Sequence, residues 1–293
     1  MDFSFEEIMG RGGQQKKRRV VISGKRDTNA LSAILAARDR GWIDPVACGC
    51  SLSGLGKEMD VHFADSDMLK ARQHALRLLE QGEADALLDM GPSNNRLFSV
   101  IDETLTHTKK SHLLSYVSVF RAPKNGRITL LTDTLINSKP GLKEKIEIVE
   151  NAIRVGKGLG ISQPKIAALG PLELVNPSIP STLDAAMLSK MSERRQFGGA
   201  IVEGPLAMDN AESALAARHK GIESPVPGNV DIYLFPDLES ANITAQFLGF
   251  LGSFQLGGVL AGTRLPIIIR SSLESPDSWL LNIALGLVVN RGI

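Results

Sequence analysis

A set of polar and charged side chains lies at the ends of apolar runs in this sequence, and their types suit the binding of a polar ligand. The set is Asn137, Glu203, Asp209, Asn210, Lys220, Asp231, Asp237, Asn242, Arg264, Arg270, Ser271 and Ser272. Each of them alone is typical of a helix cap, a turn or a surface position. Open α/β sheets, however, gather their ligands just past the carboxyl ends of the strands. The repetition of such residues after apolar runs, densest in the stretch 203–242, therefore predicts a ligand site.

Apolar runs typical of buried strands alternate with amphipathic helical patterns, and these elements must position the polar set. The predicted strands are 20–22, 45–48, 84–88, 165–169, 199–202, 231–235, 257–260 and 266–269, and the predicted helices include 68–81, 142–159, 183–191 and 279–289. Residues 112–120 and 127–132 read as a hairpin around Lys124-Asn125-Gly126. The alternation indicates α/β architecture with largely parallel sheets and helices on both faces.

The loop after the predicted strand 84–88 is a second place where a ligand could bind. It reads Asp89-Met-Gly-Pro-Ser-Asn94 and precedes a helical pattern at 97–105. Such a loop can cap the helix and bind an anion at its amino end. The simpler interpretation, a cap and nothing more, also fits the residues.

Composition limits the classes of function. The chain has 293 residues, a formal net charge of +1 and two cysteines, Cys48 and Cys50. This length favours one large or two medium domains. The near-neutral charge gives no electrostatic reason to expect nucleic acid or a membrane surface as a partner. Neither a signal peptide nor an apolar run of the ~18 residues that a transmembrane helix needs is present. We therefore expect a cytoplasmic protein with reduced thiols.

Three familiar kinds of catalytic site are missing from the sequence. The five histidines have no metal-ligand spacing and the two cysteines have no second pair, so we expect no dedicated metal site. Neither a Gly-x-Ser-x-Gly elbow nor a Walker A motif occurs.

From Leu87 to its end, the sequence resembles the phosphate acetyl/butyryl transferases, and the butyryl branch most. The matching segments are TDTLIN (132–137), KIEIVENAI (145–153), STLDAAMLSKM (181–191), EGPLAMDNA (203–211), HKGI (219–222), SPVPGNVDIYLFPDLESAN (224–242) and PIII (266–269). The resemblance implies two α/β domains of the isocitrate/isopropylmalate-dehydrogenase-like kind. The first domain would comprise residues 1–140 and 263–293, the inserted second domain residues 141–262, and the active-site cleft would lie between them.

The resemblance also implies an activity: transfer of a short acyl group between coenzyme A and inorganic phosphate. It implies a homodimer that uses acyl-CoA as a substrate and holds no cofactor permanently. Cations must then neutralise the phosphate groups, a base must deprotonate the thiol, and donors must hold the developing oxyanion, all of which needs no metal. The predicted catalytic residues are Ser271, Asp277 and Ser278. The predicted substrate-binding residues are Asn137, Glu203, Asn210, Lys220, Asn242, Arg264, Arg270 and Ser272.

Three cationic positions of the family carry other residues here. The lysine of the family's Leu-Met-Lys-Gly loop is Asp89, the lysine of its Tyr-Lys pair is Gln246, and the arginine of its Thr-Ser-Arg segment is Ser272. Each lost charge-assisted contact to a buried phosphate would cost about 1.5–3 kcal/mol. These losses leave an alternative open, which is a catalytically inactive or repurposed relative that acts as a binding or regulatory protein.

A third alternative is a metal-dependent decarboxylating dehydrogenase on the same fold. It would need several acids to converge on one divalent cation. Asp231, Asp237 and Glu239 are the only acids near one predicted strand.

Overall fold

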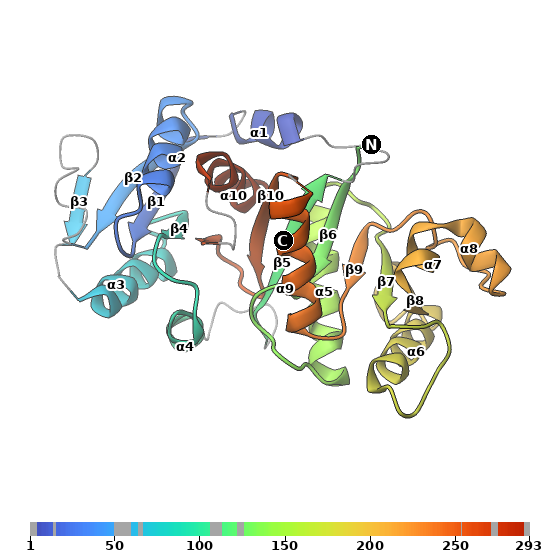
Figure 1. The fold of residues 1–293 in the computed structure, drawn as a ribbon. Helices are drawn as coiled ribbons and strands as arrows, with labels where there is room; N and C mark the ends of the chain where they lie inside the picture. Colours follow the sequence, from blue (N-terminus) through green and yellow to red (C-terminus); the bar gives the residue numbers. More distant parts are fainter. Residues whose placement is uncertain are drawn as a thin grey trace. The chain divides into compact units, whose positions relative to one another are not determined.

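The computed structural model describes residues 5–13, 16–49, 60–63, 67–105, 113–121, 126–252, 254–270 and 275–289, drawn in Figure 1. They form two compact units. The terminal unit combines Ser4–Leu114 with Gln255–Ile293, and the central unit spans Ser115–Phe254. Within each unit, residues pack mainly on other residues of the same unit. The domain boundaries expected from sequence, after residues 140 and 262, stay a prediction that limited proteolysis can test.

The terminal unit is built on a parallel sheet with the strand order β11-β4-β1-β2-β3. Its strands are β1 (Arg18–Ser23), β2 (Ile43–Cys48), β3 (Asp60–Phe63), β4 (Ala86–Asp89) and β11 (Ile267–Ile269). Side chains of β4 and β11 are buried throughout, as expected of parallel strands covered on both faces. From β1 the chain runs outward to β2 and β3 and then returns to β4 on the other side of β1. The neighbours β1 and β4 therefore mark the topological switch point of this sheet.

Helices of the terminal unit are α1 (Phe5–Gly13), α2 (Thr28–Asp39), α3 (Met68–Glu80), α4 (Asn95–Thr104) and α10 (Pro276–Val289). Asp27, Asp67 and Asn94 begin α2, α3 and α4, because each side chain accepts a hydrogen bond from a first-turn amide. Residues 278–289 of α10 are buried all around, and the helix packs on α1, α2 and strand β10 (Leu256–Ala261). The helix predicted at 279–289 is thus confirmed as a core helix.

In the central unit, the sheet order runs β5-β6-β9-β7-β8. The strands are β5 (Ser115–Arg121), β6 (Ile128–Thr132), β7 (Lys165–Leu169), β8 (Ile201–Leu206) and β9 (Ile232–Leu234). The predicted hairpin is confirmed, since β5 and β6 pair antiparallel, although its turn residues Lys124 and Asn125 lie outside the described residues. The pairs β6–β9, β9–β7 and β7–β8 are parallel.

The sheet of the central unit is accompanied by α5 (Leu142–Gly158), α6 (Pro180–Glu193), α7 (Met208–Glu212), α8 (Ala214–His219) and α9 (Leu238–Gln246), which continues into the π-helix η3 (Phe247–Leu251). In Figure 1, α5 lies alongside β5 and β6, and α6 alongside β8, in agreement with their contacts. The expected fold class, two α/β units with largely parallel sheets, is confirmed. Among the described helices, none has the length and apolar character needed to cross a membrane.

One strand end differs from the sequence prediction, and one residue of the polar set lies at the other end of its strand from the rest. We expected a strand to end at Val202, but β8 continues to Leu206, so Glu203 lies within the strand. The continuation is possible because β8 is the last strand in the order, and Pro205, which lacks an N–H, costs no ladder bond on an open edge. Asp231 precedes β9 and therefore lies at its amino end, away from the carboxyl end that Asp237 follows.

Candidate functional site

The loop after β6 is organised by the carboxylate of Asp133. Its Oδ1 accepts hydrogen bonds from the backbone amides of Tyr116 (3.1 Å), Leu135 (2.9 Å) and Ile136 (3.1 Å). Its Oδ2 accepts from both the backbone amide (3.1 Å) and the side-chain amide (2.5 Å) of Asn137. Burial raises the pKa of Asp133, and these N–H donors act in the opposite direction. The TDTLIN segment is thus a loop wrapped around one buried acid.

Two predicted substrate-binding residues, Asn137 and Asn242, belong to this loop or hold it. The side-chain amide of Asn242 donates to the carbonyl of Thr134 (2.9 Å), and its Oδ1 accepts from Gln246 Nε2 (2.6 Å) one helical turn later on α9. Both ends of Asn242 are therefore engaged within the central unit. Gln246, which stands where the family has a lysine, is the outer member of this chain of amides and is exposed.

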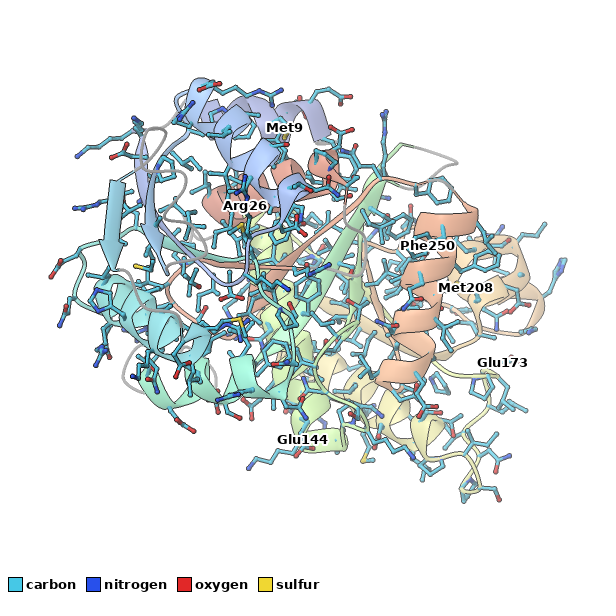
Figure 2. The ribbon with its side chains drawn as sticks, turned by 60° about the vertical axis from the view of Figure 1, so that its left-hand side comes forward. Met9, Arg26, Glu144, Glu173, Met208 and Phe250 are labelled. Atoms are coloured by element: carbon cyan, nitrogen blue, oxygen red, sulfur yellow. The ribbon has the colours of Figure 1, made fainter. Side chains whose placement is uncertain are left out.

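The other two predicted binders of the central unit that the structure brings together are Asn210 and Lys220. Lys220 Nζ lies 3.1 Å from Glu173 Oε2 and 3.2 Å from Asp209 Oδ2. Asn210, which is fully buried, donates its side-chain amide to the same Glu173 oxygen at 3.3 Å. Glu173, labelled in Figure 2, lies on the loop after β7, so the cluster joins the segments that follow β7 and β8.

The opposite charges in this cluster shift the pKa values of Lys220, Asp209 and Glu173. The hydrogen bond to Glu173 and the charges of both acids raise the pKa of Lys220. The pKa of Asp209 is lowered, chiefly by the hydrogen bond from Lys220, and that of Glu173 is lowered by its own backbone amide and by Lys220. Asn210 Oδ1 has no hydrogen-bond partner among the described residues.

The structure places Glu203 away from these two clusters. Its carboxylate accepts from the amide of Gly204, and its side chain helps line a half-open cavity of about 390 Å³. Glu193, Arg195 and Glu223 also line this cavity. Asp231 is likewise structural, because it pairs with Arg127 and accepts from the Lys165 amide at the amino edge of the sheet. Asp231 and Asp237 are at opposite ends of β9, so the acids named for a dehydrogenase metal site do not converge.

The remaining predicted residues belong to the terminal unit, after β10 and β11. Arg264 is exposed, and the carbonyl of Arg270 accepts a hydrogen bond from Ser93 Oγ at 2.7 Å. Ser271 and Ser272 lie outside the described residues. In α10, Asp277 is exposed in the first turn, whereas Ser278 is buried and accepts a hydrogen bond from the Ser275 hydroxyl at 3.0 Å.

Asp89, at the family's lysine position, is fully buried in an ion pair with Arg72 of α3. Arg72 donates from Nε to Oδ2 (2.8 Å) and from Nη2 to Oδ1 (2.7 Å), the two-pronged geometry that suits guanidinium and carboxylate. The acid that replaces the family's lysine thus has its own cation. Asn94, five residues later, caps α4 by accepting from the Leu97 amide, as both interpretations of the loop expect.

Sequence reasoning missed three residues of these clusters. Arg72 carried a signal, because it sits three residues before Ala75 and four before Leu76 and so shares the apolar face of its helix. The sequence marked Asp133 only as one residue of the TDTLIN segment and gave it no role. Glu173 lies in an irregular loop, where no periodicity marks a residue as a partner of Lys220.

Comparisons with known proteins agree with one another. A sequence model described as phosphate acetyl/butaryl transferase matches residues 51–285. Phosphate butyryltransferase of Clostridium acetobutylicum is 36% identical over 98% of this chain and 98% of its own length. Phosphate acetyltransferase of Thermotoga maritima is 30% identical over 96% and 97% of the two chains. The crystal structure of a branched-chain phosphotransacylase from Enterococcus faecalis V583 aligns with a TM-score of 0.82 at 28% identity, covering 94% of this chain and 99% of that one.

These matches cover nearly the whole chain, and they include the segments that hold the loop around Asp133 and the cluster around Lys220. None of the matches named here is to an inactive or regulatory relative. The chain belongs to the phosphate acetyl/butaryl transferase family.

Proposed function

We propose that the protein transfers a short acyl group between coenzyme A and inorganic phosphate. The observation that carries the proposal is the match to a phosphate butyryltransferase over 98% of both chains. Loops and helices after β6, β8 and β9 in the central unit carry Asn137, Asn210, Lys220 and Asn242, the proposed substrate-binding residues, past strand ends where α/β sheets bind ligands. In this proposal the enzyme works as a cytoplasmic homodimer that holds no cofactor permanently.

The reaction can be written with few demands on the protein. A phosphate oxygen attacks the thioester carbonyl, the carbon–sulfur bond breaks, and the departing thiolate takes up a proton to give coenzyme A and an acyl phosphate. In the reverse direction a base removes the thiol proton. Arg264 and Arg270 are the proposed contacts for phosphate groups, and Ser271 and Ser272 the proposed donors to the carbonyl oxygen.

Asp277 is the proposed thiol base in place of Ser278. Asp277 is exposed and carries a carboxylate, whereas Ser278 is buried and bonded to Ser275. In Asp277→Asn, the rate of acyl-CoA synthesis from acyl phosphate and coenzyme A should fall about 10²-fold or more, the usual contribution of a general base. The neighbouring Ser278→Ala variant should lose far less rate. Equal losses in the two variants would remove Asp277 from this role.

The activity itself is tested by release of free thiol from acyl-CoA. Purified protein is mixed with acetyl-, butyryl- and hexanoyl-CoA, with and without phosphate, and the thiol is followed with a chromogenic disulfide. Turnover should require phosphate, and Ser272→Arg, which restores a cation of the family, should tighten the apparent affinity for phosphate. The absence of phosphate-dependent turnover with any chain length would refute the proposed function.

An apolar surface supports the homodimer. Four large apolar side chains on α9 and η3 are exposed in the single chain: Ile243 (67%), Phe247 (60%), Phe250 (64%) and Leu251 (73%). Phe250 is labelled on this helix in Figure 2. A contiguous apolar patch on one helix is typical of an interaction surface, and a two-fold dimer would let the same patch cover itself.

The dimer is tested by sedimentation of Phe250→Glu, which places a charge inside the proposed interface. The matched control is Leu215→Glu, because Leu215 is similarly exposed (56%) but lies on α8. Wild type and the control should sediment as dimers and Phe250→Glu as a monomer. A wild-type monomer at assay concentrations would contradict the dimer without affecting the proposed reaction.

A further inference from the structure

The switch point of the terminal sheet lies between β1 and β4, where ligands of open α/β sheets usually bind. Ser23 ends β1 and Asp89 ends β4, and the two are register partners across the parallel pair. The chain diverges on both sides of this point, so the strand ends would border a crevice. In this protein the crevice is occupied by a side chain of the protein itself.

Asp89 has the surroundings of a bound oxyanion. Its Oδ2 accepts from Ser23 Oγ (2.6 Å) and Arg72 Nε (2.8 Å), and its Oδ1 accepts from Arg72 Nη2 (2.7 Å) and the amide of Gly91 (2.9 Å). The Arg72 side chain is 2% exposed and that of Asp89 is not exposed. A guanidinium, a hydroxyl and a backbone amide thus bind a carboxylate on both of its oxygens.

Close packing leaves no room for a second anion at this place. A Cβ added to Gly24, which has a φ of 95°, would lie 2.4 Å from the Gly91 nitrogen. A Cβ added to Gly91 would lie 2.3 Å from Arg72 Nη2. The backbone after β1, the backbone after β4 and the guanidinium therefore meet directly, and phosphate or coenzyme A must find its cations elsewhere.

The same ion pair is connected to the segment that the sequence assigns to catalysis. Arg72 Nη2 also donates to the carbonyl of Pro92 (3.2 Å), and the next residue, Ser93, donates from Oγ to the carbonyl of Arg270 (2.7 Å). Arg270 directly precedes Ser271. A shift of the 89–93 loop would therefore move the backbone on which the predicted reacting segment begins.

We propose that Asp89 is a built-in anion that fills the switch-point seat formed by Arg72, Ser23 and Gly91, and that the Arg72–Asp89 pair positions Ser93 and Arg270 for acyl transfer. Arg72 and Asp89 are positioning residues, because they act through Ser93 and not on the substrate. The kinetic part rests on the proposed function. The seat itself does not, since it is defined by contacts within the terminal unit.

Chemical rescue tests the seat. Asp89→Gly removes a methylene and a carboxylate, and acetate restores a methyl group and a carboxylate of the same size. Acetate should raise the melting temperature of Asp89→Gly relative to chloride at equal ionic strength, and should have no such effect on wild type or on Arg72→Met/Asp89→Gly. The matched control is Asp44→Gly, which removes an exposed acid of the same sheet that pairs with Lys17. If acetate does not stabilise Asp89→Gly specifically, the proposed anion seat is wrong.

Steady-state kinetics well below each melting temperature test the positioning. Asp89→Gly should lose about tenfold or more in kcat with a smaller change in KM, because misplacement of a reacting segment lowers turnover steeply, and acetate should restore much of it. Ser93→Ala should lower kcat without a response to acetate and with little change in melting temperature. If Asp89→Gly does not fold, Asp89→Asn, which keeps the volume but not the charge, takes its place in the kinetic measurement. A kcat within twofold of wild type in these variants would overturn the positioning role.

The two proposals fail in different ways. A wild-type protein without phosphate-dependent thiol release would refute the proposed function and with it the kinetic half of the inference. The acetate-dependent melting temperature of Asp89→Gly would still confirm or refute the seat. An active wild type combined with Asp89 variants of wild-type kcat would refute only the inference.

Discussion

Replacement of Asp133 by alanine should unfold the loop after β6 before it affects the rest of the central unit. The carboxylate, 4% exposed, accepts four backbone amides and one side-chain amide. In Asp133→Ala these donors lose their common acceptor inside the protein, where water reaches them poorly. The change tests whether one acid holds the whole TDTLIN segment.

The magnitude follows from the donors that would be left. One unpaired buried donor costs about 1–3 kcal/mol. Because the donors share two oxygens and the freed loop can admit water, we expect a loss of about 3–5 kcal/mol instead of the full sum. The matched control is Asp237→Ala, which removes a carboxylate of the same unit that caps α9 and, among the described residues, accepts from Ser240 alone. Loss of that cap should cost about 1 kcal/mol.

Native-state hydrogen exchange resolves the effect residue by residue. In Asp133→Ala the amides of Leu135, Ile136 and Asn137 should exchange much faster, while amides in the core of α5 keep their protection. Urea denaturation followed by circular dichroism gives the accompanying loss of stability. If the three amides stay protected and stability falls by no more than in Asp237→Ala, Asp133 does not organise the loop.

Further predictions concern three other sites. Burial raises the pKa of the Cys48 thiol to about 11 from an ordinary value of about 9. The thiol therefore ionises in the unfolded chain first, and its contribution to stability, complete below pH 9, falls by up to about 3 kcal/mol between pH 9 and 11. The fall in stability over this range should be smaller by that amount in Cys48→Ala. Removing the partner of the buried Lys145 in Asp184→Ala should cost about 3 kcal/mol, more than Asp184→Asn, as measured by urea denaturation; equal losses would contradict a charge effect. In Lys220→Met, the carboxyl pKa values of the two acids that contact Lys220 should rise toward ordinary values, as read by carboxyl NMR; unchanged titrations would show that the ion pairs do not form in solution.

The sequence by itself determined the elements whose patterns are local. Apolar runs of strand length and the helical face of 68–81 depend on near neighbours, so α3, the β5–β6 hairpin and the core helix α10 were predictable. Ordered segments shared with a family gave the fold class and the family, because two hundred residues of matching motifs constrain topology far more than any single pattern. Parallel order also implied that polar residues after neighbouring strands meet at one edge, as Glu173 after β7 does with Asn210 and Lys220 after β8.

Only the tertiary structure decided which polar groups satisfy one another. Arg72 and Asp89 are 17 residues apart and on different elements, and Glu173 and Lys220 are 47 apart, so no periodicity links them. The placement of Glu203 depended on whether β8 stops at Val202 or continues to Leu206. That in turn depends on the position of β8 at the edge of the sheet. The acid at the family's lysine position appears from sequence as a lost cation. In the structure it is a carboxylate bound on both oxygens, because the fold brings a guanidinium, a hydroxyl and an amide to the same point between β1 and β4.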